Sequence, residues 1–195
     1  MRHGTVGRQN QRGVTLIELM VVVVVITISM LIGMQGIEFY QRYQLQAASR
    51  QLFSAIEKIR QDALTKRTTV NPVSGTAVTS RGFGLRLVAG GNGYTTFEFN
   101  DVDNDFVYDG AVEEYAPNRS TADDGPRFSK SITLTSNVSG PLFYDERGLS
   151  RGETWGFGNR TYTLSHSNAG IQPLRCVVVS NIRAREGVWN AGDCI

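Results

Sequence analysis

The chain has 195 residues, of which 41% are hydrophobic and 21 are glycine. This length predicts one domain of ordinary size with an accessory element, and the lack of any internal repeat excludes a repeat architecture. The formal charge is +2, but three arginines and no acidic residue precede residue 14, so residues 14–195 carry 17 basic and 18 acidic side chains. Nine acidic residues lie in 98–124 and six arginines in 147–185, which predicts a dipolar domain.

The first predicted element is an apolar helix. Between Leu19 and Ile32 only Thr27 and Ser29 interrupt the apolar run. Residues 14–34 would extend about 31 Å as a helix, which is enough to cross a bilayer. Arginines precede the run and none lies within it, so we expect a cytoplasmic amino end and a chain that is outside after residue 35. No small-residue cleavage site follows, and the segment is therefore expected to stay as a transmembrane anchor.

The helical pattern continues beyond this anchor. Apolar residues recur every three or four positions at Leu45, Ala48, Leu52, Ile56, Ile59 and Ala63. No proline occurs before Pro72. The sequence therefore predicts one continuous helix from about Thr15 to about Lys66, with a globular domain packed on its second half. The alternative is two helices that are separated by a break at Gly33 or Gly36.

The start of the apolar run reads RGVTLIEL, from Arg12 to Leu19. A short basic leader, a glycine and a helix with glutamate as its fifth residue resemble the class III signal of type IV pilins and type II secretion pseudopilins. The resemblance implies that residues 1–13 are a leader, that prepilin peptidase cleaves after Gly13, and that it methylates the new amine of Val14. The family usually has phenylalanine where this chain has Val14.

Glu18 is a carboxylate at the start of an apolar helix. Such a charge inside a bilayer costs about 2.5 to 3.5 kcal/mol, so it requires a cation nearby. In the family the corresponding glutamate pairs with the amine of a neighbouring subunit as helices assemble into a filament, which would here be the amine of Val14. The alternative is that Glu18 reaches the cytoplasmic interface, one helical turn away.

Residues 67–195 are predicted to form a periplasmic β-rich domain. The segment FGLRLVAGGNGYTTFEF has a turn-forming Asn92-Gly93 pair between two strand-like runs, which predicts a hairpin. Further strands are expected in RFSKSITLTSN, LFYDERG, RTYTLSH and RCVVVSNIRAR. The predicted fold class is α+β, with the long helix packed on an antiparallel sheet or sandwich. LFYDERGLS and CVVVSNIRAR also resemble a turn and the last strand of FimT/FimU and GspH-type minor pilins and pseudopilins.

The two cysteines, Cys176 and Cys194, both fall in the last twenty residues. They could close a loop by a disulfide, which requires an oxidising compartment. The alternative is a pair of buried thiols in a cytosolic protein, and the predicted export segment argues against it.

Three patterns in the sequence suggest a catalytic or binding site: a serine motif, a run of aspartates and, in the last predicted strand, a pair of arginines. GLSRG, which includes Ser150, has the spacing of a hydrolase nucleophile elbow, but ETWGFGN does not favour the helix that an elbow needs. Asp101, Asp103, Asp105 and Asp109 have the spacing of calcium ligands, although Phe106 stands where a calcium loop has glycine. The alternative to this structural calcium site is a solvated hairpin that is rich in aspartate.

Arg183 and Arg185 are two apart in a predicted strand, which would put them on one face where they could contact phosphates. FimT-type competence pilins carry a similar Gly-Arg-x-Arg patch that is implicated in DNA binding, but Ile182 replaces its glycine here. The alternative for these arginines is a solvated face or a salt bridge to the acidic region.

The sequence thus predicts a structural subunit and no enzyme. The resemblance implies a minor pilin or pseudopilin at the tip or in the initiation complex of a type IV pilus or a type II secretion pseudopilus. The expected partners are prepilin peptidase, other pilins and inner-membrane lipid before assembly. The alternative is a DNA-binding minor pilin that acts as a receptor in natural transformation.

Overall fold

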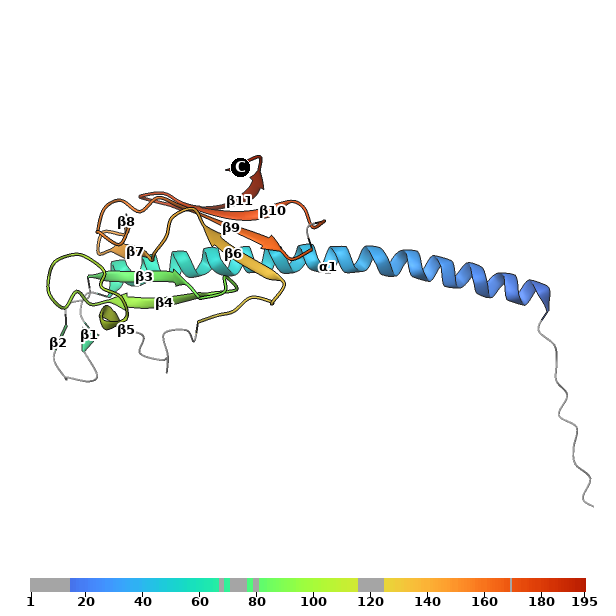
Figure 1. The fold of residues 1–195 in the computed structure, drawn as a ribbon, viewed down its shortest axis with the longest axis horizontal. Coiled ribbons are helices and arrows are strands. Elements are labelled where there is room, and N and C mark those ends of the chain that lie inside the picture. Colours follow the sequence, from blue (N-terminus) through green and yellow to red (C-terminus); the bar gives the residue numbers. More distant parts are fainter. Residues whose placement is uncertain (1–14, 67–68, 71–76, 79–80, 116–124, 169) are drawn as a thin grey trace, which may run out of the picture. The chain divides into compact units, whose positions relative to one another are not determined.

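The computed structural model describes residues 15–66, 69–70, 77–78, 81–115, 125–168 and 170–195 (Figure 1). The chain divides into two compact units, Met1–Tyr40 and Gln41–Ile195. One helix, α1 (Leu16–Thr65), contributes to both. Its bounds differ by one residue at each end from the predicted helix, and it is continuous through Gly33 and Gly36. The prediction of a single long helix is therefore confirmed.

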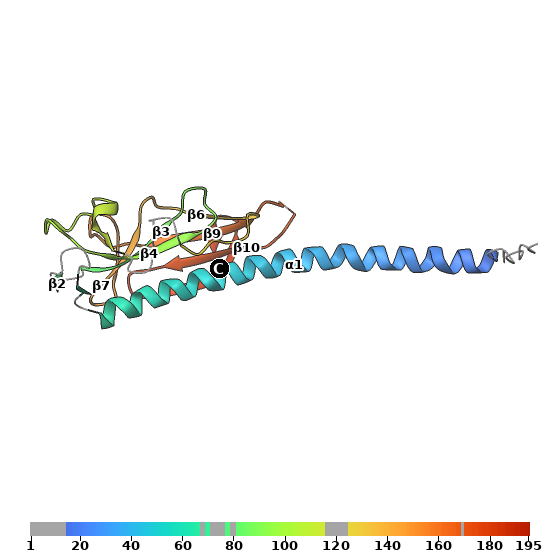
Figure 2. The ribbon, with the colours of Figure 1, turned by 90° about the horizontal axis from the view of Figure 1, so that it is seen from below.

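The second unit contains two five-stranded antiparallel sheets, and Figure 2 shows the Gln41–Thr65 part of α1 lying along them. The first sheet has the order β12-β11-β10-β9-β6, with β6 Ile132–Ser136, β9 Arg160–His166, β10 Leu174–Val179, β11 Ala184–Asn190 and β12 Asp193–Cys194. The second has the order β5-β4-β3-β7-β8, with β3 Gly82–Leu87, β4 Tyr94–Phe99, β5 Glu114–Tyr115, β7 Leu142–Asp145 and β8 Ser150–Arg151. A short pair, β1 (Thr69–Val70) and β2 (Ala77–Val78), lies outside both sheets.

The main core joins α1 to both sheets. The predicted apolar stripe is buried, with all six of its side chains at most 4% exposed: Leu45, Ala48, Leu52, Ile56, Ile59 and Ala63. They pack with Leu85 and Leu142 from one sheet and Leu164 and Val177 from the other. The α+β fold, with a helix packed on antiparallel sheets, is confirmed.

The predicted hairpin is present as β3 and β4, whose last pair is Leu87 with Tyr94. Its left-handed turn residues are Gly90 and Gly91, with φ of 92° and 68°, and they precede the predicted Asn92-Gly93 pair. The Gly91 N–H donates to the Val88 carbonyl at 3.0 Å and closes the turn. Glycine adopts a left-handed conformation at no steric cost. The turn therefore forms at Gly90 and Gly91, two residues before the predicted position.

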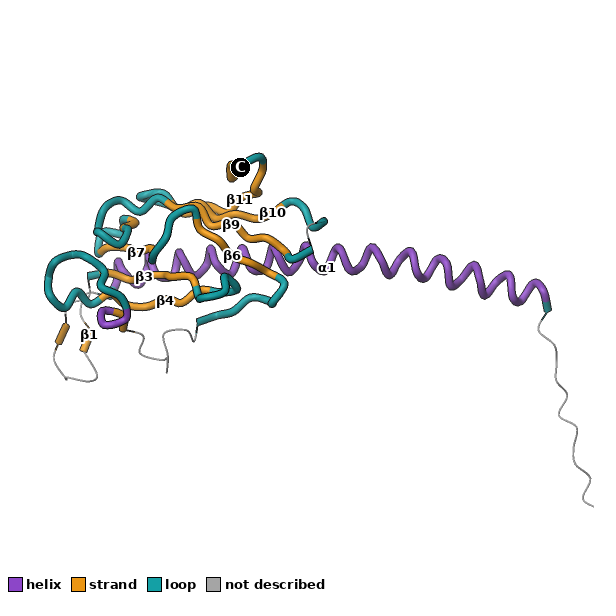
Figure 3. Tube along the Cα trace, in the orientation of Figure 1, coloured by secondary structure: helices purple, strands orange, loops and turns teal. Residues whose placement is uncertain are grey.

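A second core of aromatic rings lies on the face of the β3-containing sheet opposite to α1. Phe97, Phe99 and Phe143 form it, with Tyr108 and Trp155 packed against them from two loops. In Figure 3 the teal connection between β4 and the 3-10 helix η1 (Ala111–Glu113) is one of these loops. A Cβ at Gly84 would lie 2.6 Å from the Phe97 ring, so this strand position needs glycine. Two loops of the domain are thus anchored by aromatic packing.

Candidate functional site

The candidate assembly site is the amino end of α1. The helix begins at Leu16, and the Glu18 N–H donates to the Thr15 hydroxyl at 3.3 Å. Thr15 therefore caps the helix. Thr15 and Glu18 also have the S/T-x-x-E spacing of a capping box, a pattern that the sequence analysis did not identify. A carboxylate in the first turn is also favoured by the helix dipole. Gly13 and Val14 lie outside the described residues.

Apolar side chains surround this end of the helix. Every large hydrophobic residue from Leu16 to Ile26 is about half exposed or more. Across the described residues, no helix is both long and apolar enough to span a membrane. Glu18 has no ion-pair partner in the described part of the chain. An uncovered apolar surface next to an unpaired carboxylate is suited to contact with other apolar helices that supply a cation.

Residues 8–34 match the family model of the prokaryotic N-terminal methylation motif. The matched segment includes the end of the basic leader and the start of α1, and Glu18 lies within it. No curated protein matches the chain. Among solved structures, the minor pseudopilin EpsH from the type 2 secretion system of Vibrio cholerae is similar, with 12% identity and a TM-score of 0.49 over 77% of this chain and 99% of that one.

The predicted disulfide is confirmed. Cys176 and Cys194 are bonded, with their Cα atoms 6.0 Å apart. The bridge holds β12 against β11, where a Cβ at Gly187 would lie 2.8 Å from the Cys194 sulfur. Gly187 therefore leaves room for β12 to lie against β11.

The structure corrects the predicted last strand. CVVVSNIRAR is divided into β10 and β11 by a turn, in which the Ser180 N–H donates to the Arg183 carbonyl at 2.8 Å. Arg183 lies in this turn and Arg185 in β11, so the two do not share a strand face. Both are exposed, and Arg185 Nη2 donates to the Cys194 carbonyl at 2.6 Å. Ser180 and Asn181 are common turn residues, a signal that the strand prediction overlooked.

The aspartate-rich loop forms only part of the predicted cation set. Asp101, Asp103 and Asp105 bring carboxylate oxygens within 4.8 Å of one another, but Asp109 is not among them. The Asp109 N–H instead donates to Glu113 Oε2 at 2.8 Å. Phe106, which replaces the glycine of a calcium loop, adopts a left-handed φ of 61°. Aromatic packing thus holds a conformation that usually favours glycine.

Arg81 serves this loop as its cation. Its Nε lies 3.4 Å from Asp101 Oδ2, and its Nη2 donates to Asn104 Oδ1 at 2.5 Å. The guanidinium also lies over the Phe106 ring, 4.6 Å from the centroid. Asp101 is fully buried, so this neighbouring positive charge offsets the cost of its desolvation.

The nucleophile elbow is absent from this part of the chain. Ser150 is buried in β8, its hydroxyl donates to the Ser180 carbonyl at 3.3 Å, and no helix follows. His166 is the histidine that a hydrolase would need after the predicted leader cleavage, and its Nδ1 accepts from the Asn168 N–H at 3.0 Å. The Gly148 carbonyl accepts from Arg60 Nε at 3.2 Å, so the GLSRG turn packs on α1. Its role is structural, which contradicts the hydrolase alternative.

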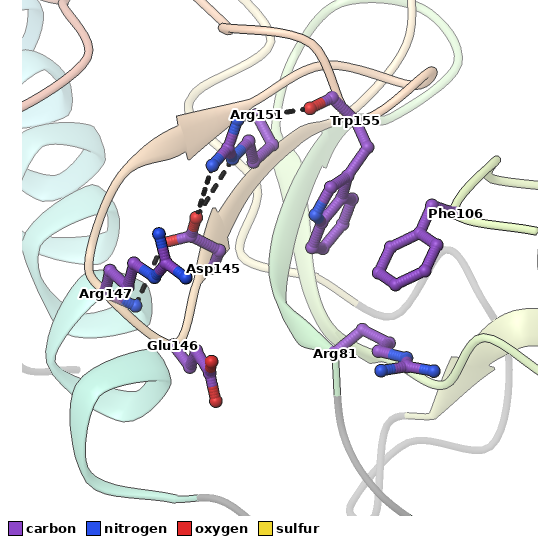
Figure 4. Close-up of a pocket in the computed structure, with 7 residues that line it drawn as sticks. All are labelled: Arg81, Phe106, Asp145, Glu146, Arg147, Arg151 and Trp155. Atoms are coloured by element: carbon purple, nitrogen blue, oxygen red, sulfur yellow. Dashed lines mark hydrogen bonds and ion pairs between the residues drawn. The ribbon is translucent and has the colours of Figure 1, made fainter. Parts of the chain in front are cut away.

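A pocket of about 280 Å³ lies between the aspartate-rich loop and the turn from β7 to β8 (Figure 4). Phe106 and Trp155 form its aromatic wall, and Arg81, Glu146 and Arg147 lie around it. Sequence reasoning missed this pocket because its residues come from four separate segments.

Proposed function

We propose that the protein is a structural subunit of the minor pilin or pseudopilin type, in the tip or initiation complex of a type IV pilus or a type II secretion pseudopilus. The observation that carries the proposal is the methylation motif at residues 8–34, which includes Glu18 in the first turn of a 50-residue helix. Exposed apolar side chains along the start of that helix support packing against other subunits.

In this proposal prepilin peptidase removes residues 1–13 and methylates the Val14 amine. The apolar segment at 14–34 then holds the subunit in the inner membrane, with residues 67–195 in the periplasm, until it joins the filament. A disulfide between Cys176 and Cys194 is consistent with that compartment, because disulfides persist under oxidising conditions. The other pilins or pseudopilins of the filament are the main partners.

We expect Glu18→Gln to abolish or strongly reduce incorporation into fibres, because the amide keeps the size of the side chain but cannot neutralise the Val14 amine of a neighbour. The measurement compares the subunit in sheared fibres with the subunit in membranes. Lys58→Gln, an exposed change on the same helix, is the control and should assemble normally.

Mass spectrometry of the same fibres should find the chain from Val14 onward with one added methyl group. Normal assembly of Glu18→Gln, or working fibres that contain residues 1–13, would contradict the proposal. Strains that lack the protein should lose pili if it serves a pilus, or exoprotein export if it serves secretion.

The alternative function is a receptor for DNA at the tip of a pilus. Exposure of Arg183 and Arg185 supports it, but their separation between a turn and a strand weakens a shared phosphate grip. If DNA binding is correct, Arg183→Ala with Arg185→Ala abolishes salt-sensitive DNA retention and leaves fibre formation intact. Unchanged retention in the double variant would rule out this site.

A further inference from the structure

We propose that the pocket between the aspartate-rich loop and the β7–β8 turn binds an acidic segment of a neighbouring protein that also carries an apolar side chain. All of its lining residues belong to the unit Gln41–Ile195. The pocket volume of about 280 Å³ is enough for one or two side chains, which fits a short peptide segment better than a large ligand.

The apolar side of the pocket is formed by Phe106 and Trp155. Both adopt left-handed backbone conformations, with φ of 61° and 56°, which are unfavourable for bulky side chains. Arg81 holds Phe106 from below by stacking, and Arg151 Nη1 donates to the Trp155 carbonyl at 3.3 Å. Phe106 nevertheless remains 41% exposed. Strained and supported residues of this kind are common where a protein recognises a partner.

Some charged side chains of the pocket have a partner within the domain, and others have groups left to bind a ligand. Asp145 accepts from Arg151 Nε at 3.0 Å and Nη2 at 2.8 Å, so these two neutralise each other. Arg147 and Glu146 are exposed, and neither side chain has an ion-pair partner among the residues that the structure describes. Arg81 Nε and Nη2 are in use, but no described residue accepts from its Nη1. The available donors are therefore on two arginines, against one available carboxylate.

This balance favours a carboxylate ligand that stands beside an apolar group. The carboxylate would bind Arg147, and the apolar side chain would pack on Phe106 and Trp155. A nucleic acid is disfavoured, because it would bring several phosphates to a small pocket that also presents the exposed carboxylate of Glu146. A single acidic side chain of a protein can avoid that repulsion.

Trp155 allows a direct test, since the chain has only two tryptophans. The experiment uses the full chain in detergent with Trp189→Phe, so that fluorescence reports Trp155. The probes are the peptide acetyl-Glu-Leu-Glu-Phe-amide, the same peptide with lysine in place of glutamate, and a decathymidylate. We expect a saturable change with the acidic peptide and a much weaker change with the other two.

The variants test the charge assignment. Arg147→Gln should weaken binding of the acidic peptide about fivefold, and Glu146→Gln should strengthen it about twofold or more, because a repulsive charge is removed. Arg50→Gln, at an exposed arginine of α1 that does not line the pocket, is the matched control and should bind normally. All three positions are exposed, and a thermal melt of each variant checks folding.

The proposal is overturned if the acidic peptide gives no saturable change, or if Arg147→Gln binds it as well as the parent does. It is equally overturned if the basic peptide binds more tightly. Tighter binding of decathymidylate that depends on Arg147 would instead identify a nucleic-acid site.

Discussion

At the scale of single residues, burial changes the acid–base behaviour of a tyrosine. Tyr162 is 1% exposed in the core, whereas Tyr43 is 60% exposed on α1. Burial raises the pKa of Tyr162 from 10.0 to about 12, and the Arg160 guanidinium beside it opposes the rise. The pKa of Tyr162 is higher in the folded than in the unfolded protein, so the stabilisation by its buried neutral phenol is fully present below pH 10. Its contribution is lost as pH rises from 10 to about 12.

We therefore expect the free energy of unfolding to fall between pH 10 and 12, with Tyr162 accounting for about 2 kcal/mol of the loss. Tyr162→Phe should therefore be less sensitive to pH in that range than the parent protein is. Urea unfolding at several pH values measures this. An unchanged pH dependence in Tyr162→Phe would show that its phenol does not ionise on unfolding.

The backbone conformations of single residues were the features hardest to predict from the sequence. The left-handed conformations of Phe106 and Trp155 have no local signal, because bulky residues rarely adopt them and only the aromatic packing around them imposes it. Thr15 and Glu18, in contrast, follow a known capping pattern and could have been recognised.

At the scale of elements, periodic patterns were predictable and short connections were not. The apolar run at 14–34 and the stripe from Leu45 to Ala63 together predicted α1 within one residue at its ends, because both patterns continue along the sequence without a proline. The strand prediction for CVVVSNIRAR was wrong, because four residues are enough to reverse the chain between β10 and β11.

The disulfide gives a prediction at the same scale. It closes a loop of 18 residues around the β10–β11 hairpin, so its loss should lower stability by about 3 kcal/mol. We expect Cys176→Ser with Cys194→Ser to unfold at lower urea concentration than the oxidised parent. Adding a reductant to the parent should reproduce the shift and leave the double variant unaffected. Equal midpoints with and without the bridge would contradict this prediction.

At the scale of the whole molecule, the fold class could be predicted but the sheet order could not. A helix followed by alternating strands indicates an α+β domain, and the structure confirms it. The order β5-β4-β3-β7-β8 depends on pairing between β3 and β7, which are far apart in the sequence and leave no local pattern. The pocket and the second aromatic core depend on the same distant pairings, so they became visible only in three dimensions.

The position of β12 has a further consequence for solubility. Its two residues pair with Trp189 and Asn190 of β11, at the border of the five-stranded sheet. Without that cover, the unsatisfied N–H and C=O groups of β11 would be open to strand addition by another molecule. The cystine thus keeps Trp189 and Asn190 of β11 covered, and its reduction would leave this part of the sheet edge open to another strand.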